Sequence, residues 1–316
     1  MILSVSRRTD IPAHYSDWFF NRLEAGYACT RNPMNFRQVS RIVIAPAVVD
    51  GFVFWTKNPT PMVDRLHRLA EYPYYFQFTL NAYGKDLEPG LPGKQEVLVP
   101  AFQSLSRQIG PERVIWRYDP IVLTDAYTLE HHIRYFDALA KRLSGFTQRC
   151  IISFVDQYRH LGSRFRPLGT TEIEILAEHF SGIALQYGLT LETCAEAVDL
   201  SRFGIGHGHC IDGRLFEQLL NQPLNLSKDK NQRPACGCTA SIDLGMYDCC
   251  PNGCRYCYAN HSQTAVRRNI LAHDPQSPLL YGQISPEDTV RDRTMISHKI
   301  TQLNLFEGEE HRHDQL

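Results

Sequence analysis

Short runs of apolar, β-branched or aromatic residues alternate with amphipathic segments up to about residue 200 of this chain. Runs of this kind, four to eight residues long, predict buried β-strands. The predicted strands cover residues 42–45, 52–56, 75–80, 114–118, 151–155 and 189–193. No other feature of the sequence restricts the possible folds as strongly.

Segments with helical periodicity lie between most of these strands. One begins near Thr128 and places Leu129, Ile133, Phe136, Ala140 and Leu143 on one stripe. A second begins with a capping box at residues 171–174 and ends before Gly188, a residue suited to a C-cap. Strand-helix alternation predicts an α/β fold whose parallel sheet is covered by helices, either open or rolled into a partial TIM-type (β/α) barrel.

Polar residues follow several of the predicted strands, and parallel α/β folds bind ligands at the carboxyl edge of the sheet. Any one set could be an ordinary cap or ion pair, but five sets at one edge predict a binding site. The sets are Arg7 to Asp10, Thr56 to Pro59, Arg117 to Pro120, Asp156 with Gln157, and Glu192 to Glu196.

Three cysteines near the end of the chain, Cys250, Cys254 and Cys257, have the spacing C-x3-C-x2-C. Three thiolates on one short loop can hold three irons of a [4Fe-4S] cluster and leave the fourth iron open to another ligand. The spacing therefore predicts redox or radical chemistry.

The loop CPNGCRYC, in which Tyr256 precedes the last cysteine, resembles the cluster loop of radical S-adenosylmethionine (SAM) enzymes. The resemblance implies that SAM binds the open iron and is cleaved to a 5'-deoxyadenosyl radical. Most members of that superfamily carry the loop after the first barrel strand, near the N-terminus. The whole chain is more similar to an uncharacterised prokaryotic family of unknown function with such a cluster at its C-terminus.

Two short strings resemble the spore photoproduct lyase branch of radical SAM proteins, namely Thr56-Lys57 and Asp119-Pro120. If both match, the chain carries the later barrel strands first and the cluster loop last, as a circular permutation.

No clear equivalent of the Gly-Gly-Glu element that binds the SAM amino group is present. The candidate cofactor-binding residues are Thr56, Lys57, Asn58 and Tyr256. The candidate catalytic residues are Lys57, Arg117 and Asp119.

The remaining cysteines extend the metal prediction. Cys194, Cys210, Cys236 and Cys238 are candidates for a second cluster whose irons are all bound by the protein. A zinc site made of Cys236 and Cys238 with Cys254 and Cys257 is the alternative. Cys249 is a spare thiol that could join either set. Cys29 and Cys150 are predicted to be small apolar core residues.

The domain organisation predicted is an α/β barrel domain at 1–220, a linker at 221–233, a cluster segment at 234–262 and an extension at 263–316. The formal net charge of −1 argues against whole-molecule attraction to nucleic acid. No apolar run is long enough for a membrane helix and no signal-peptide core follows Met1. We therefore expect a cytoplasmic protein that does not bind membranes.

A pentapeptide in the tail resembles the QLxLF motif with which bacterial proteins dock on the DNA sliding clamp. Its anchors are Gln302, Leu303, Leu305 and Phe306. The alternative is that these apolar residues cover the protein's own core.

These observations predict a radical-SAM-like enzyme supplied with electrons by a flavodoxin or ferredoxin. Its substrate is unknown, and nucleic acid is one candidate. The alternatives are an iron-sulfur or zinc binding module without chemistry of its own, and an enzyme that uses the open iron without SAM.

Overall fold

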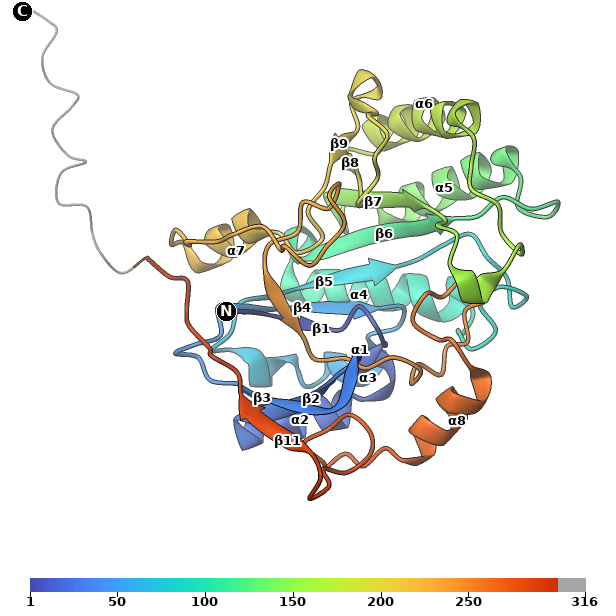
Figure 1. Ribbon diagram of the computed structural model, residues 1–316. Coiled ribbons are helices and arrows are strands. Elements are labelled where there is room, and N and C mark those ends of the chain that lie inside the picture. The colour runs from blue at the N-terminus through green and yellow to red at the C-terminus, as the bar shows by residue number, and fades with distance from the viewer. Residues whose placement is uncertain (301–316) are drawn as a thin grey trace, which may run out of the picture.

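A parallel β-sheet forms the centre of the molecule (Figure 1). The structure is a computed structural model and describes residues 1–300. Eight strands lie in the order β10-β1-β4-β5-β6-β7-β8-β9, and all neighbours are parallel. The strands are β1 (Ile2–Val5), β4 (Gly51–Thr56), β5 (Tyr74–Thr79), β6 (Val114–Ile121), β7 (Arg149–Phe154), β8 (Thr190–Thr193), β9 (Gly206–His207) and β10 (Ser241–Asp243). Within residues 1–300 no hydrogen bonds join β9 to β10, so the sheet has two edges.

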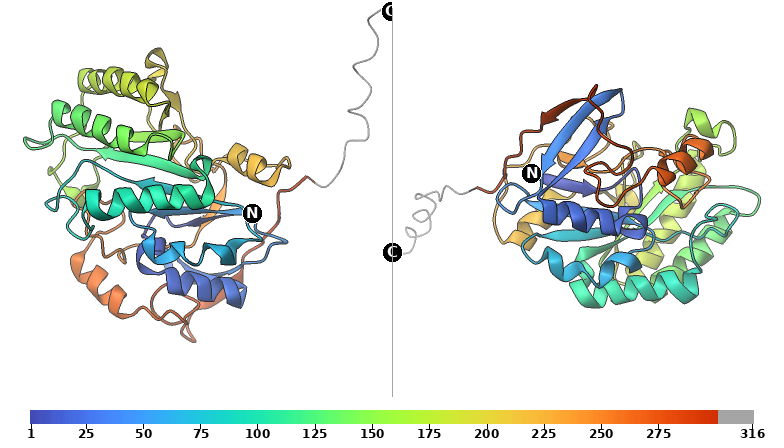
Figure 2. Two further views of the ribbon diagram at one scale, coloured as in Figure 1. Left: turned by 180° about the vertical axis from the view of Figure 1, so that it is seen from behind. Right: turned by 90° about the horizontal axis from the view of Figure 1, so that it is seen from below.

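Helices cover the sheet, and α4, α5 and α6 lie side by side on one of its faces (Figure 2). The helices are α1 (Ile11–His14), α2 (Ser16–Ala25), α3 (Thr60–Val63), α4 (Val99–Ile109), α5 (Leu129–Leu143), α6 (Thr170–Gln186), α7 (Gly213–Leu220) and α8 (Gln263–Leu271). Short 3₁₀ turns occupy Leu66–Leu69, Pro111–Arg113, Arg159–Leu161 and Ser201–Phe203, and one π turn occupies Lys94–Leu98.

Five of the six predicted strands belong to the central sheet, but the run at 42–45 does not. It is the end of β3 (Asn35–Val43), which pairs antiparallel with β2 (Tyr27–Asn32) and parallel with β11 (Thr289–Asp292) in a separate small sheet. The run is apolar like the others, and its composition does not reveal which sheet it joins. The prediction that it belongs to the parallel sheet was wrong.

Both predicted helices are present. Thr128 caps α5, and its side-chain oxygen accepts a hydrogen bond from the His131 amide at 3.2 Å. Helix α6 begins one residue earlier than the predicted box, and Glu172 Oε2 accepts from the Gly169 amide at 2.8 Å. The capping residue is therefore Gly169 rather than Thr171. The helix ends before Gly188, which has a positive φ of 69°.

The two faces of the sheet differ in chemistry. Alternate strand residues pack on the helix-covered face, while Val53, Ile115 and Ile151 form a second apolar cluster on the opposite face with Phe216 of α7. Two residues further along their strands, that opposite face carries Trp55, Arg117 and Ser153. The opposite face is therefore apolar toward the strand starts and polar toward the strand ends.

The predicted linker at 221–233 packs against the cysteine-rich segment, because Lys228 forms a β-bridge with Thr239. The four domain boundaries stay predictions. The tail motif at Gln302, Leu303, Leu305 and Phe306 lies outside the described residues. No helix within residues 1–300 is long and apolar enough to cross a membrane.

Candidate functional site

A cavity of about 400 Å³ lies at the carboxyl ends of the strands. Its volume is within the range of small-molecule sites. Each of the five predicted sets of strand-end residues contributes to its lining. The contributing residues are Arg7, Arg8, Thr9, Asp10, Thr56, Lys57, Arg117, Asp119, Pro120, Asp156, Cys194 and Ala195. The expected convergence of these sets at one edge is present.

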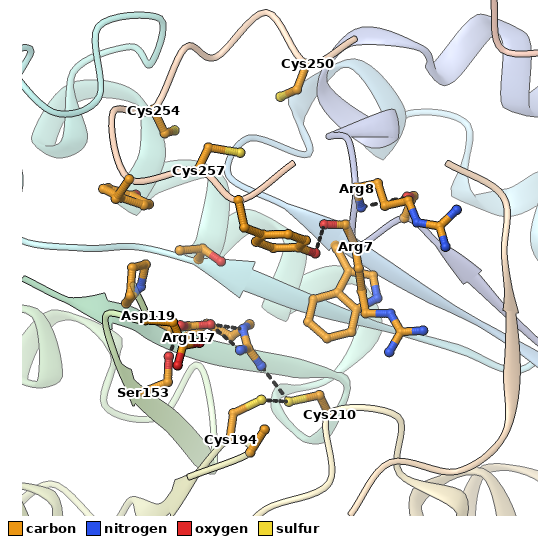
Figure 3. A pocket seen from close by; sticks show the side chains of 18 of the residues that line it. Arg7, Arg8, Arg117, Asp119, Ser153, Cys194, Cys210, Cys250, Cys254 and Cys257 are labelled. Carbon is orange, nitrogen blue, oxygen red and sulfur yellow. Dashed lines mark hydrogen bonds and ion pairs between the residues drawn. The ribbon is translucent and has the colours of Figure 1, made fainter. Parts of the chain in front are cut away.

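All seven cysteines predicted to bind metal line this one cavity, although they come from four separate regions of the sequence. In Figure 3, Cys250, Cys254 and Cys257 lie on one side, and Cys194 and Cys210 lie on the other. The side chains of Arg117 and Asp119 lie on the same side as Cys194 and Cys210. Cys249 is not part of the lining; its thiol is buried and lies 3.0 Å from the Met246 carbonyl oxygen.

The loop that carries Cys250, Cys254 and Cys257, hereafter the cysteine loop (residues 250–257), follows β10 after a connection at 244–249. Asp243, the last residue of β10, accepts hydrogen bonds from the hydroxyls of Ser4 at 3.0 Å and Ser6 at 2.7 Å on and after β1. A Cβ on Gly245 would come within 1.7 Å of Ser6 Oγ, so the chain can pass β1 this closely only with glycine there. These contacts lead the cysteine loop over the end of β1.

Asn252 fixes the first half of the cysteine loop. Its side-chain amide lies 3.2 Å from Asp10 Oδ2, and its Oδ1 lies 2.7 Å from His14 Nε2. Its backbone carbonyl accepts from the Gly90 amide at 3.0 Å. Asp10 Oδ2 also accepts from the Lys57 amide at 2.8 Å. One carboxylate thereby connects the ends of β1 and β4 to the cysteine loop.

Tyr256 fixes the second half. Its hydroxyl contacts Lys57 Nζ at 2.9 Å, Asn81 Nδ2 at 3.1 Å and the buried carboxylate of Glu88. Glu88 also forms ion pairs with Lys57 and Lys94, both at 2.9 Å.

The charges of this network stabilise one another. Burial is the largest single effect and would lower the pKa of Lys57, but Glu88, Cys254 and Asp119 together outweigh burial and raise that pKa. Burial would raise the pKa of Glu88, yet the two lysines lower it. Lys57 is therefore a fixed cation beside the cysteine loop.

Arg117 and Asp119, on β6, form an ion pair in the cavity wall. The hydroxyl of Ser153 also donates to Asp119 (Figure 3). Burial would raise the pKa of Asp119, but Arg117 and Ser153 lower it. The Arg117 guanidinium also lies over the Trp55 ring, 5.0 Å from its centroid.

Cys250 is buried, while Cys254 and Cys257 are half-buried and face the cavity. Burial raises the pKa of Cys254 to about 12 and raises the pKa values of Cys250 and Cys257 as well. Within residues 1–300, no group of three or more His, Cys, Asp or Glu side chains is arranged so that it could hold a metal ion in the present rotamers. The donor set still suits a [4Fe-4S] cluster, since three thiols of one loop face a cavity whose cations can balance thiolate charge.

The structure places one of the candidate cofactor-binding residues outside the cavity. Asn58 does not line the cavity; its Oδ1 accepts from the Thr60 hydroxyl at 2.7 Å, an ordinary capping contact. Sequence reasoning missed Glu88, Asn81 and Asn252. Asn252 could have been found, because it lies inside the cysteine motif, whereas no local pattern marks Glu88 or Asn81.

The fold and this site define an α/β protein with a cysteine-lined cavity at the carboxyl edge of a parallel sheet. A family model described as "Domain of unknown function (DUF1848)" matches residues 2–259, and the chain belongs to this family. The matched region includes all seven cavity cysteines. Comparisons with curated proteins and with solved structures found no match.

Proposed function

We propose that this protein is a radical-SAM-type iron-sulfur enzyme built on a circularly permuted partial (β/α) barrel. The observation that carries the proposal is the position of β10, the last strand of the sheet in sequence. It pairs with β1, so the spatial order begins β10-β1-β4-β5 and the cysteine loop follows the first strand of that order. The resemblance to radical SAM enzymes implies this placement of the loop.

Cys250, Cys254 and Cys257 would hold the cluster. When bound, the cluster would supply the electron that cleaves SAM reductively to methionine and a 5'-deoxyadenosyl radical. The protein's part is to hold the loop in place through Asn252 and Tyr256, so that its thiols face the cavity.

Residues 6–10 are the best-placed candidates for binding the polar end of SAM. They follow the strand next to β10, where the resemblance implies a Gly-Gly-Glu-like element. The Arg8 guanidinium lines the cavity, lies over the Tyr247 ring at 4.9 Å and makes one long hydrogen bond of 3.5 Å to the Gly245 carbonyl. It forms no ion pair within residues 1–300, so its charge would be available to a carboxylate. Lys57 and Thr56 line the same cavity.

The other wall would receive the substrate. Arg117 and Asp119 supply a cation and an anion there, and the buried Trp55 Nε1 has no hydrogen-bond partner within residues 1–300. A substrate acceptor group would satisfy that donor. The net charge of −1 gives no support to a nucleic-acid substrate. Ten free thiols support a reducing, cytoplasmic setting with a flavodoxin or ferredoxin as electron donor.

The test is anaerobic reconstitution with iron and sulfide, followed by addition of SAM and dithionite. We expect release of 5'-deoxyadenosine from the wild type and its loss in Cys254→Ser. Cys249→Ser is the matched control, because this neighbouring thiol lies outside the cavity, and it should retain activity. Cluster-loaded wild type that releases no 5'-deoxyadenosine would contradict the proposal and favour a binding module or a cluster that acts without SAM.

A further inference from the structure

Four cysteines that the proposed SAM chemistry does not use form a continuous group of thiols on the second wall of the cavity. Cys194 Sγ lies 2.8 Å from Cys210 Sγ. Cys238 contacts both Cys210 and Cys236 through their thiols. All four are free and line the cavity. By contrast, the core cysteines Cys29 and Cys150 do not line it.

The backbone around these thiols is held by buried polar contacts. Tyr75 and Gln77, on β5, donate to the Cys210 carbonyl at 2.8 and 2.9 Å. The amide of Thr239 donates to the carbonyl of Ile211 at 3.0 Å. The segments carrying Cys210 and Cys238 are therefore joined to each other and to the sheet.

A buried cation faces the group. Arg117 is 4% exposed, and its Nη1 lies 2.8 Å from Cys210 Sγ. Asp119 forms an ion pair with the Arg117 guanidinium. The Nη1 atom of that guanidinium, however, points to the Cys210 sulfur and not to the Asp119 carboxylate (Figure 3). The Arg117 guanidinium therefore places a positive charge against this group, and that charge would partly balance the negative charge of a thiolate-bound metal centre.

We propose that Cys194, Cys210, Cys236 and Cys238 form a second, four-thiolate metal centre, distinct from the site of the cysteine loop. Four thiolates suit either a fully protein-bound [4Fe-4S] cluster or a tetrahedral zinc ion. In this structure the four thiols contact one another in a row. Metal binding would require their side chains to rotate until all four sulfur atoms face one centre. With the backbone held as described, side-chain rotation supplies this movement. We expect iron, because the group opens onto the same cavity as the cysteine loop.

The test is the count of iron, sulfide and zinc per chain after anaerobic reconstitution. We expect about eight irons in the wild type and about four in either Cys250→Ser/Cys254→Ser/Cys257→Ser or Cys194→Ser/Cys210→Ser. About four irons and one zinc in the wild type, with the zinc lost in Cys194→Ser/Cys210→Ser, would support the centre with zinc as its metal.

Two outcomes separate this proposal from the proposed function. A wild type with about four irons and no zinc, all lost in the triple variant, would overturn the second centre alone. Four irons retained in the triple variant and absent from Cys194→Ser/Cys210→Ser would support the second centre and contradict the first.

A further measurement uses only the wild type, so its result does not depend on whether the variants fold. Reconstituted protein is alkylated with iodoacetamide and its peptides are analysed by mass spectrometry. We expect Cys194, Cys210, Cys236 and Cys238 to be protected and to become reactive after chelation under denaturing conditions. Equal alkylation of these four with and without bound metal, in the folded protein, would overturn the proposal.

Discussion

The hydroxyl of Tyr256 lies 2.9 Å from Nζ of Lys57, although the two residues are 199 positions apart. Tyr256 belongs to the cysteine loop and Lys57 follows β4, so this contact joins the last part of the fold to the middle of the sheet. Glu88 binds both groups and is 2% exposed. The cysteine loop is therefore fixed by a buried polar network in addition to the covalent chain, and this network can be tested.

Tyr256→Phe should lower the free energy of unfolding by about 1–3 kcal/mol, because it leaves buried partners at Asn81 and Glu88 without their hydrogen bonds. Anaerobic urea unfolding measures the change. Tyr135→Phe is the matched control, since Tyr135 is 40% exposed and should show little effect. Equal stability of Tyr256→Phe and the wild type would show that the network does not stabilise the fold.

Glu88→Gln should destabilise the protein by about 3–5 kcal/mol, because Lys57 and Lys94 would both lose their buried counter-ion. The double variant Glu88→Gln/Lys94→Met should recover part of this loss by removing one unpaired charge. Thermal unfolding of the three proteins tests the expectation. A double variant less stable than Glu88→Gln would contradict this charge-based account.

Gly90→Ala should displace the cysteine loop, because the added Cβ would lie 2.6 Å from the backbone oxygen and 2.8 Å from the Cα of Asn252. We expect a stability loss of about 1–3 kcal/mol and reduced iron loading. Gly182→Ala is the control: this position in α6 has no atom within 4 Å of a new Cβ, and alanine should stabilise the helix by about 0.5–1 kcal/mol. Full iron loading of Gly90→Ala would contradict the close approach.

His132 should make stability depend on pH. It is buried between the Tyr118 hydroxyl at 2.7 Å and the Val122 carbonyl at 2.9 Å, and burial lowers its pKa to about 4. The unfolded chain takes up a proton below about pH 6.5 while the folded protein resists until about pH 4. Stability is therefore complete above pH 6.5 and falls as pH decreases toward 4, by at most about 3 kcal/mol.

His132→Gln should remove that part of the pH dependence. Urea unfolding of both proteins at several pH values between 4 and 7.5 gives the difference. The same slope in variant and wild type would show that His132 does not protonate on unfolding in this range.

Local sequence patterns predicted much of the fold. The runs at 52–56, 75–80, 114–118, 151–155 and 189–193 all became strands of the central sheet. The first four are almost entirely buried and therefore apolar on both faces, whereas the last alternates between buried and more exposed residues. Thr128 and Gly188 marked the limits of two helices through capping chemistry, which depends on near neighbours. The cysteine spacing and the polar strand ends also indicated where a site would form.

Tertiary structure alone decided how these parts meet. The run at 42–45 joined a different sheet, β10 took its place beside β1, and Glu88 came to bind both Lys57 and the cysteine loop. Four thiols from three segments met on one cavity wall. The sequence determines which face of a strand is apolar and where a helix begins, because these follow from contacts a few residues apart. Strand order and loop partners follow from burying the whole core at once, and that long-range packing leaves no local pattern.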